Sequence, residues 1–381
     1  MTPTDHSAPP APTARPVPTS VSFSIYFLLS LVGCLAAVLV LNLAGNGTNL
    51  FPSPGFPPSA CMRAWKARRI ARLANTAHAP QTLVMGSSRV IPLEEVDVAA
   101  STGAPAFNLG VSVGCPVDFL AQLRFVTEAG LRPKHIILGI DELAFGDNPE
   151  ADFYDMQLVT HTPLFHQLGL RDQLPIIVQI LKKTISFTST KKSVGNLWRR
   201  WRHPIHRVPG DTELPESELE SMHLHEGDAL SEHERRARLT AGIDRLVAFW
   251  NKYLDRPDKV DGMRPTRRKV QMFEEFLTLA ARRGIHVTVV LLPAHPDFER
   301  RTFTPAVLRI RTELGAMLAA RCPGTGCTYR DFTELASFGG NPDDFDDGTH
   351  MTRGNGRRML AAIFGKNTAS TNDAGTSRRN E

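Results

Sequence analysis

Hydrophobic positions divide the chain into regions with different patterns. Residues 21–44 are almost continuously apolar and contain no charged side chain. From residue 80 to residue 365, short apolar runs alternate with helical periodicity, except that residues 150–265 look helical and polar without a clear strand. Strands separated by helices are typical of an α/β fold with a parallel sheet. The pattern therefore predicts a membrane-spanning helix followed by a three-layer α/β/α domain over residues 80–365, with a helical insertion at about 150–265.

Individual elements follow from the same periodicities. Apolar runs predict strands, and hydrophobic residues recurring every three or four positions predict helices. The basic amphipathic helix at residues 62–76 can either lie against the membrane or pack on the domain. The predicted strands are residues 82–85, 104–109, 135–139, 286–292 and 328–332, and the further helices are residues 117–129, 267–283, 305–321 and 353–364.

The apolar segment at residues 21–44 is long enough to cross a bilayer. At about 1.5 Å per residue it spans roughly 30 Å or more, which matches the hydrocarbon core. A cleaved signal peptide usually has a shorter apolar stretch, so a membrane anchor is favoured. Leu31-Val32-Gly33-Cys34 resembles a lipobox, which leaves a lipoprotein cut before Cys34 as the alternative. Residues 1–20 and 366–381 are predicted to be disordered tails, and residues 45–79 a spacer that includes the basic segment.

Composition excludes several classes of protein. A hydrophobic fraction of 42% excludes an intrinsically disordered chain. The net charge of +5 is spread over 381 residues, which argues against a nucleic-acid partner. None of the five cysteines forms a C-x-x-C pair, so a zinc site is not expected. No other metal and no cofactor is predicted either. Cys322 and Cys327 could close a small disulfide loop if the domain is exported.

Charge is segregated within the insertion. Residues 182–207 carry eight Lys and Arg and no acid, whereas residues 211–234 carry nine Asp and Glu and no base. The favoured interpretation is a solvated helical insertion whose two halves attract each other. The alternative is that Trp198-Arg-Arg-Trp-Arg202 contacts anionic lipid or glycan.

Two short motifs carry candidate chemistry. Gly86-Ser87-Ser88-Arg89 directly follows the first predicted strand, where a serine can act as a nucleophile beside backbone N–H groups; a turn with a helix cap is the plainer alternative. Asp347 and His350 lie three residues apart just before the last helix, close enough for the carboxylate to orient the imidazole. An acidic turn with an incidental histidine would leave the same pattern.

Together these motifs resemble the first and last blocks of the SGNH (GDSL-like) hydrolase superfamily. The resemblance covers about residues 80–365, and it implies Ser88 as the nucleophile, His350 as the general base and Asp347 as the orienting acid. Residues 108–114 are similar to the second block, which implies that the N–H groups of Ser88 and Gly114 form the oxyanion hole. It also implies an SGNH or flavodoxin-like arrangement of the sheet.

The third block departs from the family pattern. Asp141 lies where the family has an asparagine that donates to the oxyanion, so the resemblance makes Asp141 a further oxyanion-hole candidate. An ionised carboxylate would repel the oxyanion, and loss of one donor costs about 2.7–4 kcal/mol of transition-state stabilisation. Two nearby residues are assigned other roles: the loop residue His295 is interpreted as structural and Cys115 as a packing residue.

A single span, a Gly-Ser-Ser block and the missing asparagine also resemble membrane-anchored SGNH-type proteins of the bacterial envelope, which act in polysaccharide acetylation or teichoic-acid alanylation. The resemblance implies an esterase or acyltransferase of a cell-surface glycan, with the lipid bilayer, an acylated glycan and a membrane-bound O-acyltransferase as candidate partners. The rival is a catalytically silent glycan-binding or assembly subunit. The resemblance implies an extracytoplasmic domain, although basic residues after the span outnumber Arg15 and favour the cytoplasm.

Overall fold

The computed structural model describes most of the chain in two compact units. One unit comprises Met1–Thr48 with Leu181–Ile205, and the other comprises Asn49–Ile180 with His206–Glu381. Almost all of the predicted tails and much of the predicted spacer lie outside the described residues. The described residues are 20–45, 62–74, 76–146, 162–202, 231–324 and 326–365.

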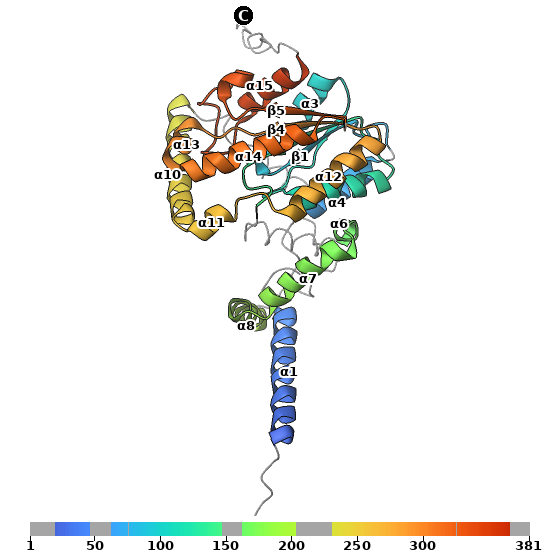
Figure 1. Cartoon of the computed structure of the whole chain (residues 1–381), viewed down its shortest axis with the longest axis vertical. Coiled ribbons are helices and arrows are strands. Elements are labelled where there is room, and N and C mark those ends of the chain that lie inside the picture. Colours follow the sequence, from blue (N-terminus) through green and yellow to red (C-terminus); the bar gives the residue numbers. More distant parts are fainter. Residues whose placement is uncertain are drawn as a thin grey trace, which may run out of the picture. The chain divides into compact units, whose positions relative to one another are not determined.

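A five-stranded parallel sheet forms the centre of the larger unit (Figure 1). The strand order is β2-β1-β3-β4-β5, which is the flavodoxin-like order of a doubly wound sheet. The α/β fold class predicted from the sequence is therefore confirmed. The strands are β1 (Thr82–Gly86), β2 (Ala106–Asn108), β3 (His135–Ile140), β4 (His286–Leu291) and β5 (Cys327–Asp331).

Alternate strand residues point into two separate cores. Leu83 and Met85 of β1 pack into one core, and Val84 packs into the other, because successive side chains leave a strand on opposite faces. Helices therefore cover both faces, which gives three layers. The first core includes residues of α2 (Met62–Leu73), α4 (Pro116–Glu128) and α12 (Arg267–Arg282); the second includes residues of α3 (Glu95–Thr102), α10 (Glu232–Leu254), α13 (Pro296–Thr302) and α15 (Arg353–Phe364); and α14 (Pro305–Arg321) contributes to both.

Predicted strands and long helices match the observed elements to within a few residues. The prediction missed α3, α13 and the 3-10 turns η1 (Ser88–Val90) and η3 (Leu335–Phe338). These elements are eight residues or fewer, so each offers at most about two turns of periodicity.

The predicted insertion is helical where the structure describes it. Its elements are α6 (Thr162–Phe165), α7 (Leu170–Thr184), α8 (Phe187–Arg202), α10 and α11 (Pro257–Asp261). However, α10 buries Leu239, Ile243 and Trp250 in the second core. A solvated insertion is therefore the wrong description of this helix. Most of the acidic half lies outside the described residues, so its predicted attraction to the basic half stays a prediction.

The smaller unit contains α1 (Ser20–Gly45) and α8. Residues 22–45 of α1 have a mean hydropathy of 2.5. Among the described residues, α1 is the helix that is long and apolar enough to cross a membrane. Cys34 lies exposed within the uninterrupted helix. Length and composition thus agree with the predicted span, and they leave its orientation open.

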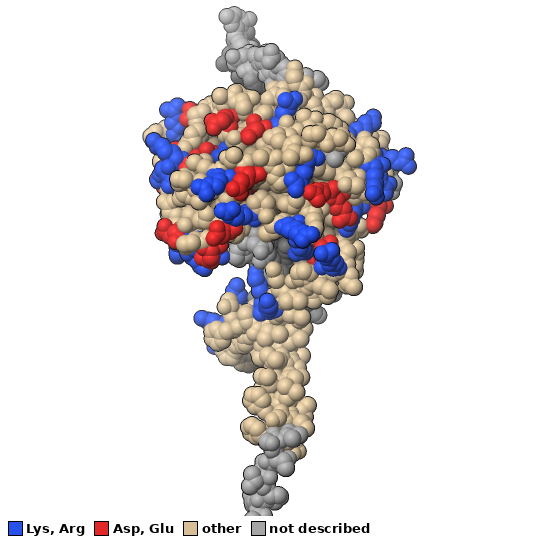
Figure 2. All heavy atoms as spheres, viewed as in Figure 1, with Lys and Arg blue, Asp and Glu red and all other residues tan. Residues whose placement is uncertain are grey.

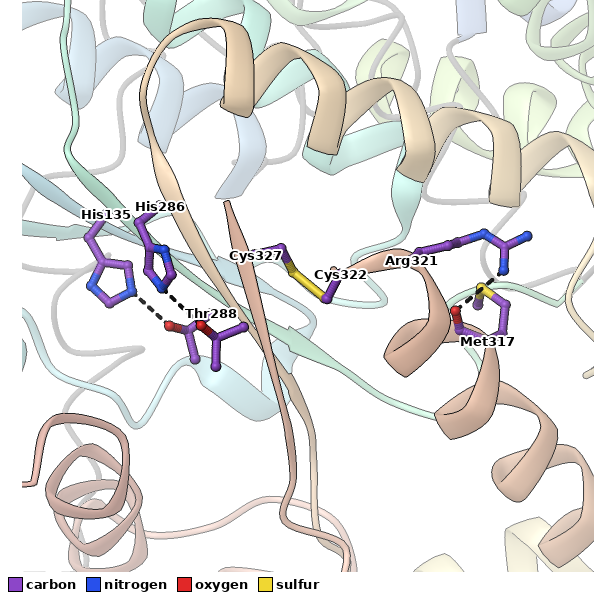
Figure 3. Close-up of a disulfide and its surroundings, with 8 residues drawn as sticks. His135, His286, Thr288, Met317, Arg321, Cys322 and Cys327 are labelled. Atoms are coloured by element: carbon purple, nitrogen blue, oxygen red, sulfur yellow. Dashed lines mark hydrogen bonds between the residues drawn. A yellow bond between two sulfur atoms is a disulfide. The ribbon is translucent and has the colours of Figure 1, made fainter. Parts of the chain in front are cut away.

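A disulfide joins the end of α14 to the start of β5 (Figure 3). Cys322 and Cys327 form it, as the sequence suggested. At the neighbouring strand starts, His135 Nε2 lies 2.8 Å from Thr288 Oγ1, and burial lowers the pKa of His135 to about 4. These groups lie at the amino ends of β3 and β4, at the opposite end of the strands from Ser88.

Candidate active site

The candidate site lies where the strand order reverses. From β1 the chain forms β2 on one side, and from β2 it crosses back to form β3 on the other side of β1. Ligands of doubly wound sheets bind at such a switch point beyond the carboxyl ends of the strands. Gly86 pairs with Gly139 at these ends. Ser88 follows β1 by two residues and Asp141 follows Gly139 by two, so both predicted positions reach the same edge.

Glycine makes the turn before Ser88 possible. Gly86 has a φ of +147°, and a Cβ there would lie 2.6 Å from the carbonyl oxygen of Gly139. No larger residue fits this position without moving the neighbouring strand. The chain then turns at once into η1, with the Ser87 side chain accepting from the Arg89 N–H. This turn presents Ser88 at the mouth of the sheet, half-buried and within reach of solvent.

Ser88, His350 and Asp347 form a continuous hydrogen-bonded chain. Ser88 Oγ lies 2.9 Å from His350 Nε2, and His350 Nδ1 lies 2.8 Å from Asp347 Oδ2. In the tautomer whose Nδ1–H donates to Asp347, Nε2 accepts the Ser88 hydroxyl proton. Ser88 and His350 are 262 positions apart in the sequence. In the fold, the contacts among the three residues nevertheless have the lengths that a nucleophile, a base and an orienting acid require.

The Asp347 carboxylate is held ionised. Burial alone would raise its pKa, but the hydrogen bond and charge of His350 and the N–H groups of Thr349 and His350 lower it to about 2. The two N–H groups both donate to Oδ1, at 2.7 and 2.9 Å, which leaves Oδ2 for the imidazole. The loop therefore fixes both the charge and the orientation of the acid.

Distant residues hold this loop in place, and the sequence motifs did not reveal them. In α10, a Cβ on Gly242 would lie 3.0 Å from Asp347 Cβ and 2.9 Å from the Asp346 carbonyl oxygen. The fully buried Asn355 donates from Nδ2 to the carbonyls of Asn341 and Asp344 at 2.8 and 2.9 Å. The helical insertion therefore contacts the acid of the candidate site directly.

The second predicted block passes against the turn that carries Ser88. A Cβ on Gly114 would lie 2.2 Å from the Gly86 carbonyl oxygen, so the two backbones are in contact. The Gly114 N–H donates to the Val111 carbonyl oxygen at 3.1 Å. The backbone of Val113, the residue before Gly114, has a φ of +50°, which is a strained conformation for a β-branched residue. The structure thus brings Gly114 to the site, and its role in an oxyanion hole stays a prediction.

Two buried basic side chains of α2 hydrogen-bond to backbone carbonyls of the loop that contains Gly114. Arg63 pairs with Asp118 at 2.6 and 2.9 Å and donates to the Ser112 carbonyl at 3.1 Å. Lys66 Nζ donates to the Gly110 carbonyl at 2.5 Å, and burial lowers the pKa of Lys66 to about 7. The basic segment at residues 62–76 therefore packs on the domain, which decides between the two alternatives left by the sequence.

Asp141 lies in a buried ionic cluster. Burial raises the pKa of Asp141, against the attraction of Arg89, and its Oδ1 accepts from the Leu143 N–H at 3.0 Å. Neighbouring Glu142 pairs with Arg89 at 2.9 Å; burial opposes ionisation, but the guanidinium lowers the Glu142 pKa. A protonated Asp141 carboxyl can donate a hydrogen bond as an asparagine amide does.

Other predicted residues have structural roles. The His295 ring accepts from the Asp297 N–H at 3.1 Å and caps α13, and Cys115 is buried at the start of α4. Within the described ranges, no three His, Cys, Asp or Glu side chains gather as a metal site requires. A hollow of about 680 Å³ lies between α7 and α12 and contains none of the three hydrogen-bonded residues, so the chemistry of Ser88 locates the site better than cavity size does.

Comparisons with known proteins leave the family open. No family model and no curated protein matches the chain. A solved structure from Bacteroides fragilis NCTC 9343, named "putative acylhydrolase", is similar at 13% sequence identity and a TM-score of 0.35, over 78% of this chain and 92% of that chain. A likeness at this level carries no argument about fold or chemistry. The geometry of Ser88, His350 and Asp347 therefore has to support any function.

Proposed function

We propose that the chain is a membrane-anchored, SGNH-like serine esterase or O-acyltransferase that acts on O-acyl groups of a cell-surface glycan. The observation that carries the proposal is the pair of contacts on one imidazole, with Ser88 Oγ at 2.9 Å and Asp347 Oδ2 at 2.8 Å. A serine turn or an acidic helix cap alone would need neither contact. Both contacts together are what acyl transfer through a covalent serine ester requires.

In this mechanism, His350 Nε2 takes the hydroxyl proton as Ser88 Oγ attacks the carbonyl carbon of an acyl ester. The imidazolium then gives that proton to the departing alcohol oxygen, which leaves an acyl group on Ser88. Water or a sugar hydroxyl attacks this ester, and His350 again accepts and returns the proton. Asp347 stays ionised throughout and stabilises the imidazolium, in keeping with its lowered pKa.

The oxyanion needs hydrogen-bond donors near Ser88. The Ser88 N–H and the Gly114 N–H are the proposed backbone donors, and a protonated Asp141 is the proposed side-chain donor. Burial supports a neutral Asp141, because removal from water penalises the carboxylate and the neighbouring Glu142 charge adds to this effect, against the attraction of Arg89. With Asp141 protonated, the donor at this position is a carboxyl O–H in place of the family's asparagine N–H. Asp141 then adds no negative charge beside the oxyanion.

Labelling by a fluorophosphonate probe tests the nucleophile. Full-length protein in detergent is expected to be labelled, and both Ser88→Ala and His350→Ala are expected to lose labelling and the hydrolysis of a small acetyl ester. Ser337→Ala is the control, because Ser337 is exposed and its hydroxyl donates to the Glu334 carbonyl, away from the Ser88, His350 and Asp347 contacts. Equal labelling of the wild type and Ser88→Ala would overturn the assignment.

We further propose that the α/β unit lies on the extracytoplasmic side. The Cys322–Cys327 disulfide supports this side, because disulfides persist in oxidising compartments. Arg63 and Lys66, which favour the cytoplasm in a simple charge count, are buried structural groups of the domain. Alkylation of intact cells should leave both cysteines unmodified until a reductant is added, whereas rapid alkylation in unreduced cell lysate would count against export.

The rival function is a catalytically silent subunit that binds glycan or a membrane-bound O-acyltransferase. The engaged N–H of Gly114 and the carboxyl at position 141 favour this rival. Acetyl-ester hydrolysis separates the two functions: a silent subunit would bind acylated glycan equally well as wild type and Ser88→Ala and would hydrolyse nothing.

A further inference from the structure

Helix α8 is fastened to the end of the apolar helix α1. Asn42 of α1 donates from Nδ2 to Thr190 Oγ1 at 2.9 Å, and Asn196 of α8 donates to the carbonyl of Gly45 at 2.9 Å. Ser193 Oγ donates to the Asn42 carbonyl at 3.4 Å. These bonds use polar groups at the last turn of α1, where its backbone carbonyls lack helical partners.

The two helices also approach closely. A Cβ on Gly45 would lie 2.6 Å from both Cβ and the carbonyl oxygen of Ser193, and Ser193 is fully buried. Small residues that let backbones meet are characteristic of helix contacts in membranes. The position of α8 is therefore specified: it lies across the end of α1, at the depth where the apolar run stops.

One side of α8 is apolar and exposed. Phe187, Val194, Trp198 and Trp201 follow each other at intervals of seven, four and three residues, which places them on one side of a helix. Phe187 is 83% exposed and Trp201 73% exposed. Contiguous large aromatic side chains are seldom exposed to water in soluble proteins, but such side chains are enriched at the interface between a membrane and water.

The flank of this apolar stripe is cationic. Lys191 and Lys192 are exposed, and the Arg202 guanidinium lies 4.8 Å from the centre of the Trp198 ring. Residues 182–207 contain eight Lys and Arg and no acid. Figure 2 shows blue Lys and Arg side chains around α8 and no red Asp or Glu side chain on the visible face of α1 or α8. An apolar stripe beside cations is the pattern of a helix that lies in a membrane surface.

We propose that α8 lies in the surface of the membrane spanned by α1 and binds anionic phospholipid headgroups, with its aromatic stripe among the upper acyl chains. The occupant is lipid because α8 is fixed at the end of the spanning helix, and its exposed cations complement anionic headgroups. The inference rests on the membrane anchor of the proposed function. It does not depend on the chemistry of Ser88.

Tryptophan quenching in nanodiscs tests the depth of α8. The full chain with Trp65→Phe and Trp250→Phe keeps Trp198 and Trp201 as its tryptophans. Lipids brominated near the headgroup end of the acyl chain should quench their emission strongly, and aqueous acrylamide should quench it weakly. Strong acrylamide quenching without bromolipid quenching would overturn the proposal, as would protection from both, which would indicate a protein partner.

Lipid charge is tested in the same background. Brominated phosphatidylglycerol in plain phosphatidylcholine should quench more than the reverse mixture, and Lys191→Glu with Lys192→Glu should reduce this preference by a factor of about five or more. Arg282→Glu with Arg283→Glu, an exposed pair on the larger unit, is the control and should leave the preference unchanged. Equal quenching by both mixtures in the wild-type helix would overturn the anionic-lipid assignment.

Carbonate extraction separates failure of this inference from failure of the anchor. All variants should stay in the membrane fraction, because α1 is intact in each. Release of the unmodified chain by carbonate would overturn both the anchor and the interfacial helix. Retention with tryptophans open to water would overturn the interfacial helix alone.

Discussion

The ion pair between Arg63 and Asp118 offers the sharpest test of how α2 supports the site. Both side chains are 1% exposed, and two N–O contacts of 2.6 and 2.9 Å join them. Replacing Arg63 with Met leaves the Asp118 carboxylate buried without its cation. Breaking a buried pair in this way typically costs about 3–5 kcal/mol of the free energy of unfolding.

The double substitution Arg63→Met with Asp118→Leu should recover most of this loss. Apolar groups of similar volume can replace a buried pair at little net cost. The double variant still loses the Arg63 bond to the Ser112 carbonyl and the Asp118 bond to the Cys115 N–H, at 3.1 and 3.2 Å. At about 1 kcal/mol for each bond, we expect a loss of about 2 kcal/mol, well below the sum of the single losses.

Thermal unfolding of the full chain in detergent measures these differences. For a large domain, about 2 °C of Tm corresponds to 1 kcal/mol, so the single variant should lose about 6–10 °C and the double variant about 4 °C. The control Arg235→Met removes the ion pair with Glu232, whose two side chains are 56% and 57% exposed. It should change Tm by less than about 2 °C. A single Arg63→Met variant as stable as this control would refute the reasoning, and so would additive losses in the double variant.

Three further predictions concern the candidate site. Asp347→Asn should reduce ester hydrolysis by about 10⁴-fold. The lowered pKa of Asp347 stabilises the folded wild type at pH values above the unfolded pKa, so acid unfolding should show the wild type losing about 2 kcal/mol relative to this variant between pH 5 and pH 2. Asp141→Asn should keep activity to a higher pH than the wild type, because burial raises the pKa of Asp141 and its neutral, donating form is lost as pH rises through that pKa; identical pH profiles of kcat/KM would count against Asp141 as a donor. Gly242→Ala should lower kcat at least tenfold by displacing Asp347, whereas Gly195→Ala, at a helical glycine with no atom within 4 Å of its Cβ, should not; equal kcat values would exclude the proposed contact.

The central strands β1, β3 and β4 were predictable because they are buried on both faces of the sheet. Residues 287–291 form an apolar run with one polar interruption, Thr288, and such a run stands out from amphipathic helices. The short helices α3 and α13 were missed for the opposite reason, since their periodicity is too brief to detect. In α10, Leu239, Ile243 and Val247 recur every four residues, so a signal of burial was present and the charged neighbours obscured it.

The candidate triad was predictable because its members lie in short local motifs. The residues that position it were not, because their partners are backbone groups far away in the sequence. Lys66 reaches the Gly110 carbonyl, and Gly242 meets the loop of Asp347, and neither contact leaves a pattern near its own position. A lysine in a basic helix and a glycine in a charged helix look like surface residues until the fold brings the partners together.

These contacts assign the insertion a necessary role. A segment added to a complete α/β domain could be removed without exposing its core, but Trp250 of α10 packs edge-on against Phe298 of α13 with ring centres 6.1 Å apart. Phe298 in turn lies 2.5 Å from the Cβ position of Gly348, which follows Asp347 in the loop that leads to His350. Removing α10 would therefore open the second core at the place where it supports the loop of Asp347 and His350. Helix α10 therefore helps to hold Asp347 and His350 opposite Ser88, and this part of the insertion belongs to the same structural unit as the candidate site.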